Sequence, residues 1–351
     1  MNSHLRKLGL DPRLGGWPRR DAAMVAKGLF VSGSTANNTR YAWRYAAAFA
    51  LAATPPFNLT SSPFRVTSLV LQSVADVSAP NDLYHTAISN AIGGAQRGEL
   101  PLYVGSVIPR GSDVYCSQIA LNASWVADAV AASAAAARAF IDEYGSAAIA
   151  GWYVTQEAFL NHLGEGCHAT AYARHLDAAA VASGYARFLG QWTRSLDALA
   201  PGLPFIWSPS APESPRRGLN TSADYARTLA ESLRTISAAA PLLTNITIQD
   251  SVGKASNVSL AQRTIRYGVG CDDAVWHANI TRSALSARVD VSINMESFLR
   301  AGQRPLHIVD LPADPRETEL REACYARQGM RLGPSWEAGY WYRQLTEEWA
   351  L

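Results

Sequence analysis

Two glutamates, Glu157 and Glu296, stand at matching places in the sequence, each shortly after a short apolar run. The runs are 149–154 and 289–293. A pair of carboxyl groups can divide acid and base work, because burial raises the pKa of one and hydrogen bonds keep the other ionised. Hydrolysis of a glycosidic bond needs such a pair: an acid protonates the leaving oxygen, and a carboxylate attacks or stabilises the sugar carbon. We therefore take Glu157 and Glu296 as the candidate catalytic pair.

Further polar and aromatic residues end the same kind of apolar run and could contact a substrate. A third carboxylate, Asp250, could bind a sugar hydroxyl, or could replace one glutamate in an inverting mechanism. The expected substrate contacts are Gln72, Tyr153, Gln156, Trp207, Gln249, Asp250, Asn294 and Trp336.

The elements that must position these residues are short apolar runs alternating with longer helical stretches. This alternation predicts parallel strands joined by crossover helices, an α/β fold. Eight such strands close a (β/α)8 barrel, whose active site forms at the carboxyl ends of the strands. We expect a single barrel domain over 27–351 after an N-terminal extension, 1–26. The predicted strands are 28–32, 68–72, 101–105, 149–154, 205–208, 246–249, 289–293 and 306–309.

The predicted helices follow the strands. The clearest follows the fourth strand, where apolar side chains recur at the spacing of one helix face. Pro201-Gly202 ends it. Other helical stretches are 41–53, 82–96 and 124–144. The apolar face consists of Tyr185, Phe188, Leu189, Trp192, Leu196 and Leu199.

The chain resembles retaining glycosidases with this barrel, which carry the acid/base after strand four, preceded by an amide residue, and the nucleophile after strand seven. Gln156-Glu157 and Glu296 look like that arrangement, although the preceding residue in those enzymes is usually Asn. The resemblance therefore implies that Glu157 is the acid/base and Glu296 the nucleophile. The chain also resembles a family of glycosidase-like barrels catalogued as a domain of unknown function (the 4434 domain). The resemblance implies the barrel fold and glycoside hydrolysis. Its segments are 27–31, 69–73, 151–157, 206–209, 249–253 and 294–298.

The cysteines and asparagines predict passage through a secretory pathway. Four cysteines fit two disulfides in an oxidising compartment, and four cysteines allow three pairings. We expect Cys116 to pair with Cys167, because both follow neighbouring strands, and Cys271 to pair with Cys324 by elimination. Residues 1–20 lack the apolar core of a signal peptide. Because the cysteines and the sequons predict secretion, we expect that a signal sequence was cleaved. Seven of the thirteen asparagines begin glycosylation sequons: Asn37, Asn58, Asn122, Asn220, Asn245, Asn257 and Asn279.

Composition excludes several classes of partner. Charged residues are 17% of the 351 residues, the formal net charge is +2, and no basic run suggests nucleic-acid binding. The sequence contains no stretch of about 18 apolar residues, so we expect no membrane span. The cysteines lack zinc-site spacing, so we expect no metal and no cofactor. We expect a secreted monomer that acts on carbohydrate, with a non-catalytic carbohydrate-binding barrel as the alternative.

Overall fold

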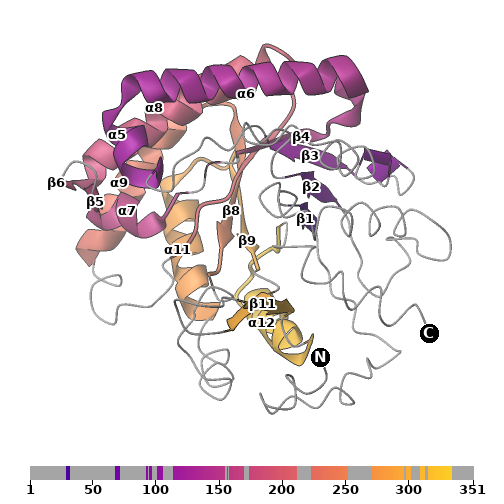
Figure 1. Ribbon diagram of the computed structural model, residues 1–351. Coiled ribbons are helices and arrows are strands. Elements are labelled where there is room, and N and C mark those ends of the chain that lie inside the picture. Colours follow the sequence, from indigo (N-terminus) through magenta and orange to yellow (C-terminus); the bar gives the residue numbers. More distant parts are fainter. Residues whose placement is uncertain are drawn as a thin grey trace, which may run out of the picture.

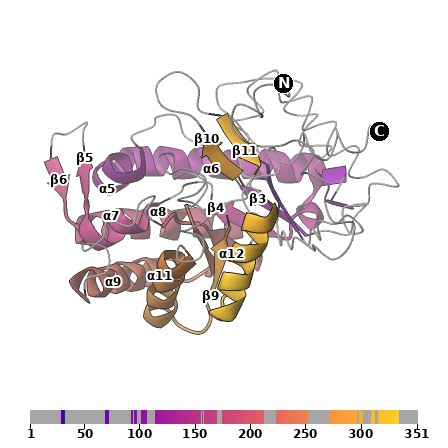
Figure 2. The same ribbon diagram turned by 90° about the horizontal axis from the view of Figure 1, so that it is seen from below.

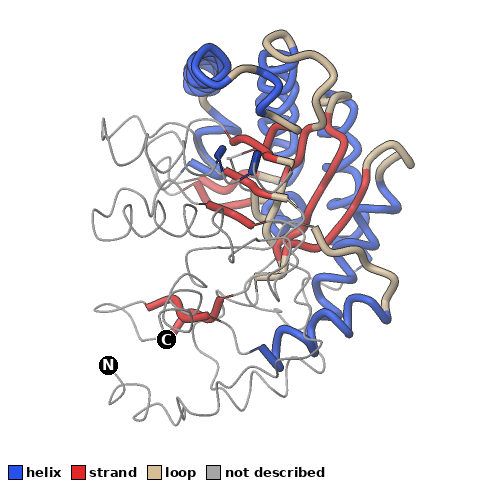
Figure 3. Tube along the Cα trace, turned by 90° about the vertical axis from the view of Figure 1, so that its right-hand side faces the viewer, coloured by secondary structure: helices blue, strands red, loops and turns tan. Residues whose placement is uncertain are grey.

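The computed structural model contains a curved parallel sheet with helices along one side (Figures 1 and 3). Among the described residues, no helix is long and apolar enough to cross a membrane. The structure describes residues 29–31, 68–71, 92–93, 95–96, 101–105, 114–154, 156, 158–169, 174–211, 223–251, 271–295, 298–301, 309–312 and 315–333.

Seven of the predicted strands lie in this sheet, in the order β1-β2-β3-β4-β7-β8-β9, and every neighbouring pair is parallel. The prediction of a parallel α/β sheet is therefore confirmed. The strands are β1 (Leu29–Val31), β2 (Leu69–Leu71), β3 (Leu102–Gly105), β4 (Gly151–Val154), β7 (Phe205–Trp207), β8 (Leu243–Gln249) and β9 (Asp290–Asn294).

In the described part of the chain, five long helices connect or follow these strands, and Figure 2 shows them beside the sheet. The predicted helix 124–144 is confirmed as α6. The helix predicted from the apolar face at 185–199 begins earlier, because the Asp177 carboxylate caps it by accepting from the Ala180 N–H at 2.7 Å. The predicted helix 41–53 lies outside the described residues. The helices are α6 (Ala123–Tyr144), α8 (Ala178–Asp197), α9 (Ala223–Ala239), α11 (Cys271–Ala284) and α12 (Pro315–Arg327).

Shorter elements fill the connections. Residues 92–93 and 95–96 are helical, within the predicted stretch 82–96. Two short antiparallel pairs lie outside the main sheet, β5 with β6 and β10 with β11. The short elements are η1 (Val114–Gln118), α5 (Ile119–Leu121), η2 (Ser146–Ala148), α7 (Leu160–Glu165), β5 (Cys167–Ala169), β6 (Arg174–Leu176), β10 (Phe298–Ala301) and β11 (Val309–Pro312).

Strand side chains alternate between the two faces of the sheet, as strand geometry requires. Trp152, Val154 and Trp207 belong to the large core between the sheet and the helices. Tyr153 and Ile206, which alternate with them, form a separate buried cluster on the other face, where Val70 and Tyr103 join them. Both faces are therefore buried, which explains why these strands read as continuous apolar runs.

The eighth predicted strand, 306–309, is not placed as predicted. Val309 belongs to β11, which pairs antiparallel with β10, and residues 306–308 lie outside the described part of the chain. The segment next to β9 is instead 331–333. Leu332 forms a parallel bridge with Ile293, whose N–H donates to the Arg331 carbonyl at 2.9 Å and whose carbonyl accepts from the Gly333 N–H at 2.7 Å.

Sequence patterns missed this segment because it contributes a single large apolar side chain and a glycine. The interior beside it is polar: the Thr247 and Ser292 hydroxyls lie 3.0 Å apart and are buried. A Cβ at Gly333 would meet Thr247 Cγ2 at 2.5 Å and Ser292 Oγ at 2.6 Å. Glycine is therefore required for this close approach to β8 and β9.

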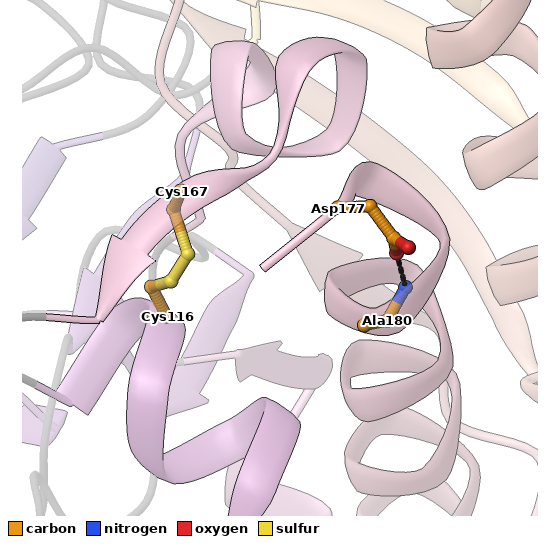
Figure 4. Close-up of a disulfide and its surroundings, with 4 residues drawn as sticks. All are labelled: Cys116, Cys167, Asp177 and Ala180. Atoms are coloured by element: carbon orange, nitrogen blue, oxygen red, sulfur yellow. Dashed lines mark hydrogen bonds between the residues drawn. A yellow bond between two sulfur atoms is a disulfide. The ribbon is translucent and has the colours of Figure 1, made fainter. Parts of the chain in front are cut away.

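Two disulfides join the connections, with the pairing expected from the sequence. Cys116 in η1 is bonded to Cys167 in β5, so the segment after β3 is tied to the segment after β4 (Figure 4). Cys271 and Cys324 join α11 to α12. The Cα atoms are 6.4 and 6.2 Å apart in the two pairs, the ordinary span of a disulfide.

The close approach of 331–333 gives a testable prediction. Gly333→Ala should lower the free energy of unfolding by about 1–3 kcal/mol, because the new methyl group has no space. Urea denaturation measures this change. In a Thr247→Ser/Ser292→Ala background, which removes the two nearest atoms, the same substitution should cost much less. An equal cost in both backgrounds would contradict the placement of Gly333 against β8 and β9.

Candidate functional site

The candidate site lies where β4, β7, β8 and β9 end, because the predicted site residues follow these strands. Glu157 and Glu296 lie outside the described residues, as do Gln72 and Trp336. Their neighbours are described: Gln156, next to Glu157, is 5% exposed, and Asn294, two residues before Glu296, is fully buried. We call residues 208–211, 249–251 and 294, at the ends of β7, β8 and β9, the carboxyl edge.

The strand order sets the distance between the two strand ends that continue into the glutamate segments. β4 and β9 are separated by β7 and β8, which makes three steps. At about 4.8 Å a step, the two strand ends lie about 14 Å apart along the sheet. Curvature of the sheet shortens this separation and turns side chains on the concave face toward one another.

Asn294, Gln249 and Ser208 form a buried hydrogen-bonded group on the carboxyl edge. The Asn294 Nδ2 donates to Ser208 Oγ at 3.2 Å, and the Gln249 Nε2 donates to the Ser208 carbonyl at 2.9 Å. The Ser208 hydroxyl in turn donates to the Thr247 carbonyl at 2.7 Å. All of these side chains are at most 2% exposed. The group therefore braces three strand ends against one another.

Ser210 and Ser251 extend this bracing beyond the strands. Their hydroxyls lie 2.9 Å apart, and the Ser251 hydroxyl donates to the Ala211 carbonyl at 2.6 Å. Ser251 has φ 55°, the one positive φ of a residue other than glycine in the described part of the chain. Such a conformation persists where surrounding contacts hold it, and it often marks functional sites.

Asp250 is held in a buried ion pair. Its Oδ2 accepts from Arg321 Nη1 at 3.2 Å and from the Tyr325 hydroxyl at 2.9 Å, and both partners lie on α12. The carboxylate side chain is 0% exposed and the guanidinium side chain 1% exposed. An acid or base in hydrolysis must reach water or substrate, so this carboxylate holds the structure together instead.

Like Gln156 and Asn294, four other predicted substrate contacts are buried in the structure. Trp207 is fully buried on the helix side of the sheet, where its ring centroid lies 6.0 Å from that of Tyr185. As the last residue of β7 it lies at the strand end, but on the face opposite to that of Tyr153 and Ile206. Gln249 and Asp250 form the hydrogen bonds described above. Tyr153, one residue before the end of β4, is fully buried in the cluster with Ile206.

Sequence reasoning missed an aromatic group between α9 and α11. The Tyr225 hydroxyl donates to His277 Nε2 at 3.1 Å, and His277 Nδ1–H donates to the Asp273 carbonyl at 2.7 Å. Trp276 stacks on Tyr225 with ring centroids 5.7 Å apart. No spacing in the sequence signals this group, because Tyr225 and His277 lie on different helices.

Burial controls the titration of this group. Loss of hydration lowers the pKa of His277 to about 4, against a partial raising effect of its hydrogen bond to Asp273. Burial, and then the charge of Glu165, raise the pKa of Tyr225. Burial also lowers the pKa of His162 on α7. At neutral pH His277 is therefore uncharged and carries its proton on Nδ1.

Three of the seven sequons fall on described residues. Asn279 is exposed on α11, whereas Asn245 is half-buried within β8. Asn122 is half-buried, and its side chain caps α6 by accepting from the Trp125 N–H at 2.9 Å. Within the described ranges, no three His, Cys, Asp or Glu side chains are grouped so that they could hold a metal ion.

Comparison with known proteins finds likeness in structure alone. No protein-family model matches the chain, and no curated protein matches it. A candidate alpha-L-fucosidase from Bacteroides thetaiotaomicron superposes with a TM-score of 0.56 and 11% identity, over 93% of this chain and 95% of that one. This likeness concerns the fold.

Two other solved structures with lower scores are also glycoside hydrolases. One is a psychrophilic glycoside hydrolase family 10 endo-beta-1,4-xylanase, with a TM-score of 0.45 and 8% identity over 82% of this chain and 84% of that one. The other is a beta-mannanase from the blue mussel Mytilus edulis, with a TM-score of 0.40 and 9% identity over 88% and 93%. Of the three, the fucosidase alone is similar enough to support the fold.

The buried His277 predicts a dependence of stability on pH. Its pKa is about 4 in the folded protein and about 6.5 when unfolded, so acid protonates the unfolded chain first. Stability is full above pH 6.5 and falls by about 1.4 kcal/mol per pH unit as the pH drops toward 4. Urea denaturation at pH 7 and pH 5 should show a smaller loss in His277→Gln than in the wild type. The exposed His168→Gln is the control, and equal losses in all three proteins would refute the prediction.

Proposed function

We propose that the chain is a (β/α)8 glycoside hydrolase with a retaining mechanism, in which Glu157 is the acid/base and Glu296 the nucleophile. The observation that carries the proposal is the sheet order. β4 and β9 run parallel, so the segments that continue into Glu157 and Glu296 leave the sheet at the same edge. The fold likeness to the candidate alpha-L-fucosidase supports the same reaction class.

The parallel bridge of Leu332 to β9 supports the barrel, because a segment after α12 takes the position next to the seventh strand. Closure requires the same segment to pair with β1. The carboxyl edge would then form part of the rim of a barrel mouth, where the active sites of such folds lie.

In the proposed reaction, protonated Glu157 gives its proton to the glycosidic oxygen as the bond to the anomeric carbon breaks. The Glu296 carboxylate attacks that carbon from the opposite side and forms a glycosyl ester. Glu157, now ionised, removes a proton from water, and the resulting oxygen attacks the anomeric carbon and releases Glu296. Two displacements restore the original configuration. This route requires carboxyl groups about 5.5 Å apart.

The alternatives make different demands on the chain. An inverting mechanism with Asp250 needs that carboxylate to activate water, and its burial against Arg321 and Tyr325 argues against this role. A non-catalytic carbohydrate-binding barrel needs neither glutamate. It would bind a glycan equally well after either glutamate is replaced, and it would show no turnover.

We further propose that the protein is secreted and N-glycosylated. Its two disulfides are typical of proteins from oxidising compartments. Asn279 is the described sequon whose side chain is exposed, so it is the one we expect to carry a glycan in the folded protein.

Replacement of the two glutamates tests the proposed hydrolysis. On a panel of 4-nitrophenyl glycosides and soluble polysaccharides, Glu157→Gln should lower kcat by about 10²–10⁴-fold because it removes the proton donor. Glu296→Gln should abolish turnover because an amide is a poor nucleophile. Proton NMR of the first product formed should show retained configuration.

The exposed Glu143→Gln on α6 is the matched control and should keep wild-type activity. Near-ultraviolet circular dichroism should show the same folded state in all three variants. Full activity of Glu296→Gln on a substrate that the wild type hydrolyses would rule out its role as nucleophile.

A further inference from the structure

Asp250 is bound to both ends of the segment that carries Glu296. At the start of the segment, the Asp250 N–H donates to the Asn294 carbonyl at 3.0 Å. After the segment, Arg321 and Tyr325 on α12 donate to the Asp250 carboxylate. The chain between Asn294 and Arg321 includes Glu296 and the β10–β11 hairpin. One residue of a neighbouring strand end is therefore bonded both to Asn294, before the segment that carries Glu296, and to α12, after it.

Asp250 is itself anchored on the side of the sheet. The residue after it, Ser251, turns with a positive φ and is held by its hydrogen bond to the Ala211 carbonyl. A shift of Asp250 along the direction of β8 would break the hydrogen bond of Ser251 to the Ala211 carbonyl. It would also break the hydrogen bond from the Asp250 N–H to the Asn294 carbonyl.

α12 is anchored on the side of the helices. Cys324, one residue before Tyr325, is bonded to Cys271 at the start of α11. Arg321 and Tyr325 lie four residues apart, so they share one face of the helix.

Stability alone does not account for this ion pair. Removing two charges from water costs several kcal/mol per ion in a protein interior, and apolar residues of similar size often serve stability equally well. A buried pair does define one arrangement of the elements that it joins, because any displacement leaves a charge uncompensated. Asn294, which accepts from the Asp250 N–H, lies two residues before the candidate nucleophile in the sequence, and this suggests which arrangement is being defined.

We propose that Asp250 and Arg321 are positioning residues for the segment that carries Glu296. Asp250 affects hydrolysis by fixing this segment, and it does not contact the sugar. This inference rests on the proposed function of Glu296. It assigns the third carboxylate of the site a role different from substrate contact and from inverting catalysis.

An apolar variant separates positioning from stability. Asp250→Leu/Arg321→Met/Tyr325→Phe removes both charges and the hydroxyl together, so neither charge of the pair is left buried without the other. Arg321→Lys keeps the charge but loses the planar fork, and we expect an intermediate effect. The exposed Arg327→Met, on the same helix, is the control and should behave as the wild type.

Amide hydrogen exchange is the first measurement, and it needs no substrate. In the apolar variant, the hairpin amides of β10 and β11 should exchange about tenfold faster than in the wild type, while α6 keeps its protection. Unchanged exchange in the hairpin would overturn the proposal. If the α6 amides also exchange faster, the apolar variant is globally destabilised. The test then uses Arg321→Lys, in which the proposal requires faster exchange confined to the hairpin.

Kinetics are the second measurement, on the 4-nitrophenyl glycoside that the wild type hydrolyses fastest. The apolar variant should lose about 10²-fold in kcat with KM unchanged. A displaced nucleophile destabilises the transition state but leaves the affinity for the substrate nearly the same. Arg321→Lys should recover part of this loss. Wild-type kcat in the apolar variant would overturn the proposal. If the wild type hydrolyses no glycoside, the proposed function fails, and the exchange result still decides whether Asp250 positions the segment.

Discussion

The Asp250 carboxylate and the Arg321 guanidinium lie against each other out of contact with water, and the carboxyl edge is arranged around this pair. Buried polar groups must find partners inside the protein, because each unpaired group costs free energy comparable to a lost hydrogen bond. Ser208, Gln249 and Asn294 meet this requirement among themselves. Asp250 meets it with side chains of a distant helix. The positions of three strand ends and of α12 are therefore mutually dependent.

Covalent links support the same arrangement on both sides. Cys116–Cys167 ties the connection after β3 to the connection after β4, and Cys271–Cys324 ties α11 to α12. Each bridge joins segments that follow neighbouring strands, so each limits the movement of the loops around the candidate site. The helical core contributes by burial: Trp192 and Phe205 pack edge to face, with ring centroids 5.8 Å apart, between α8 and the sheet. The rim of the site is thus built on rigid elements, which favours precise placement of reacting groups.

Different observations support the fold and the chemistry of the proposed hydrolase. The parallel sheet, its strand order and the likeness to the candidate fucosidase concern the fold. The chemistry depends on two glutamates that follow β4 and β9. The described residues beside them, Gln156 and Asn294, are buried amides, and Asn294 is held in place by hydrogen bonds to its neighbours. Such amides can orient a carboxylate and stabilise its ionised form.

The sequence by itself determined the alternation of strands and helices and the parallel sheet, because these follow from local periodicity and chain order. The α6 prediction is confirmed for this reason. Four cysteines allow three pairings, and the structure decided among them. Only the tertiary structure decided which face each strand residue occupies, because a sheet buried on both faces has no polar side that distinguishes them. Trp207, predicted from the sequence as a substrate contact, lies against Tyr185 of α8. Only the tertiary structure, too, placed 331–333 beside β9 and joined Asp250 to Arg321, because a glycine at a close contact and an ion pair between distant elements leave no periodic signal in the chain.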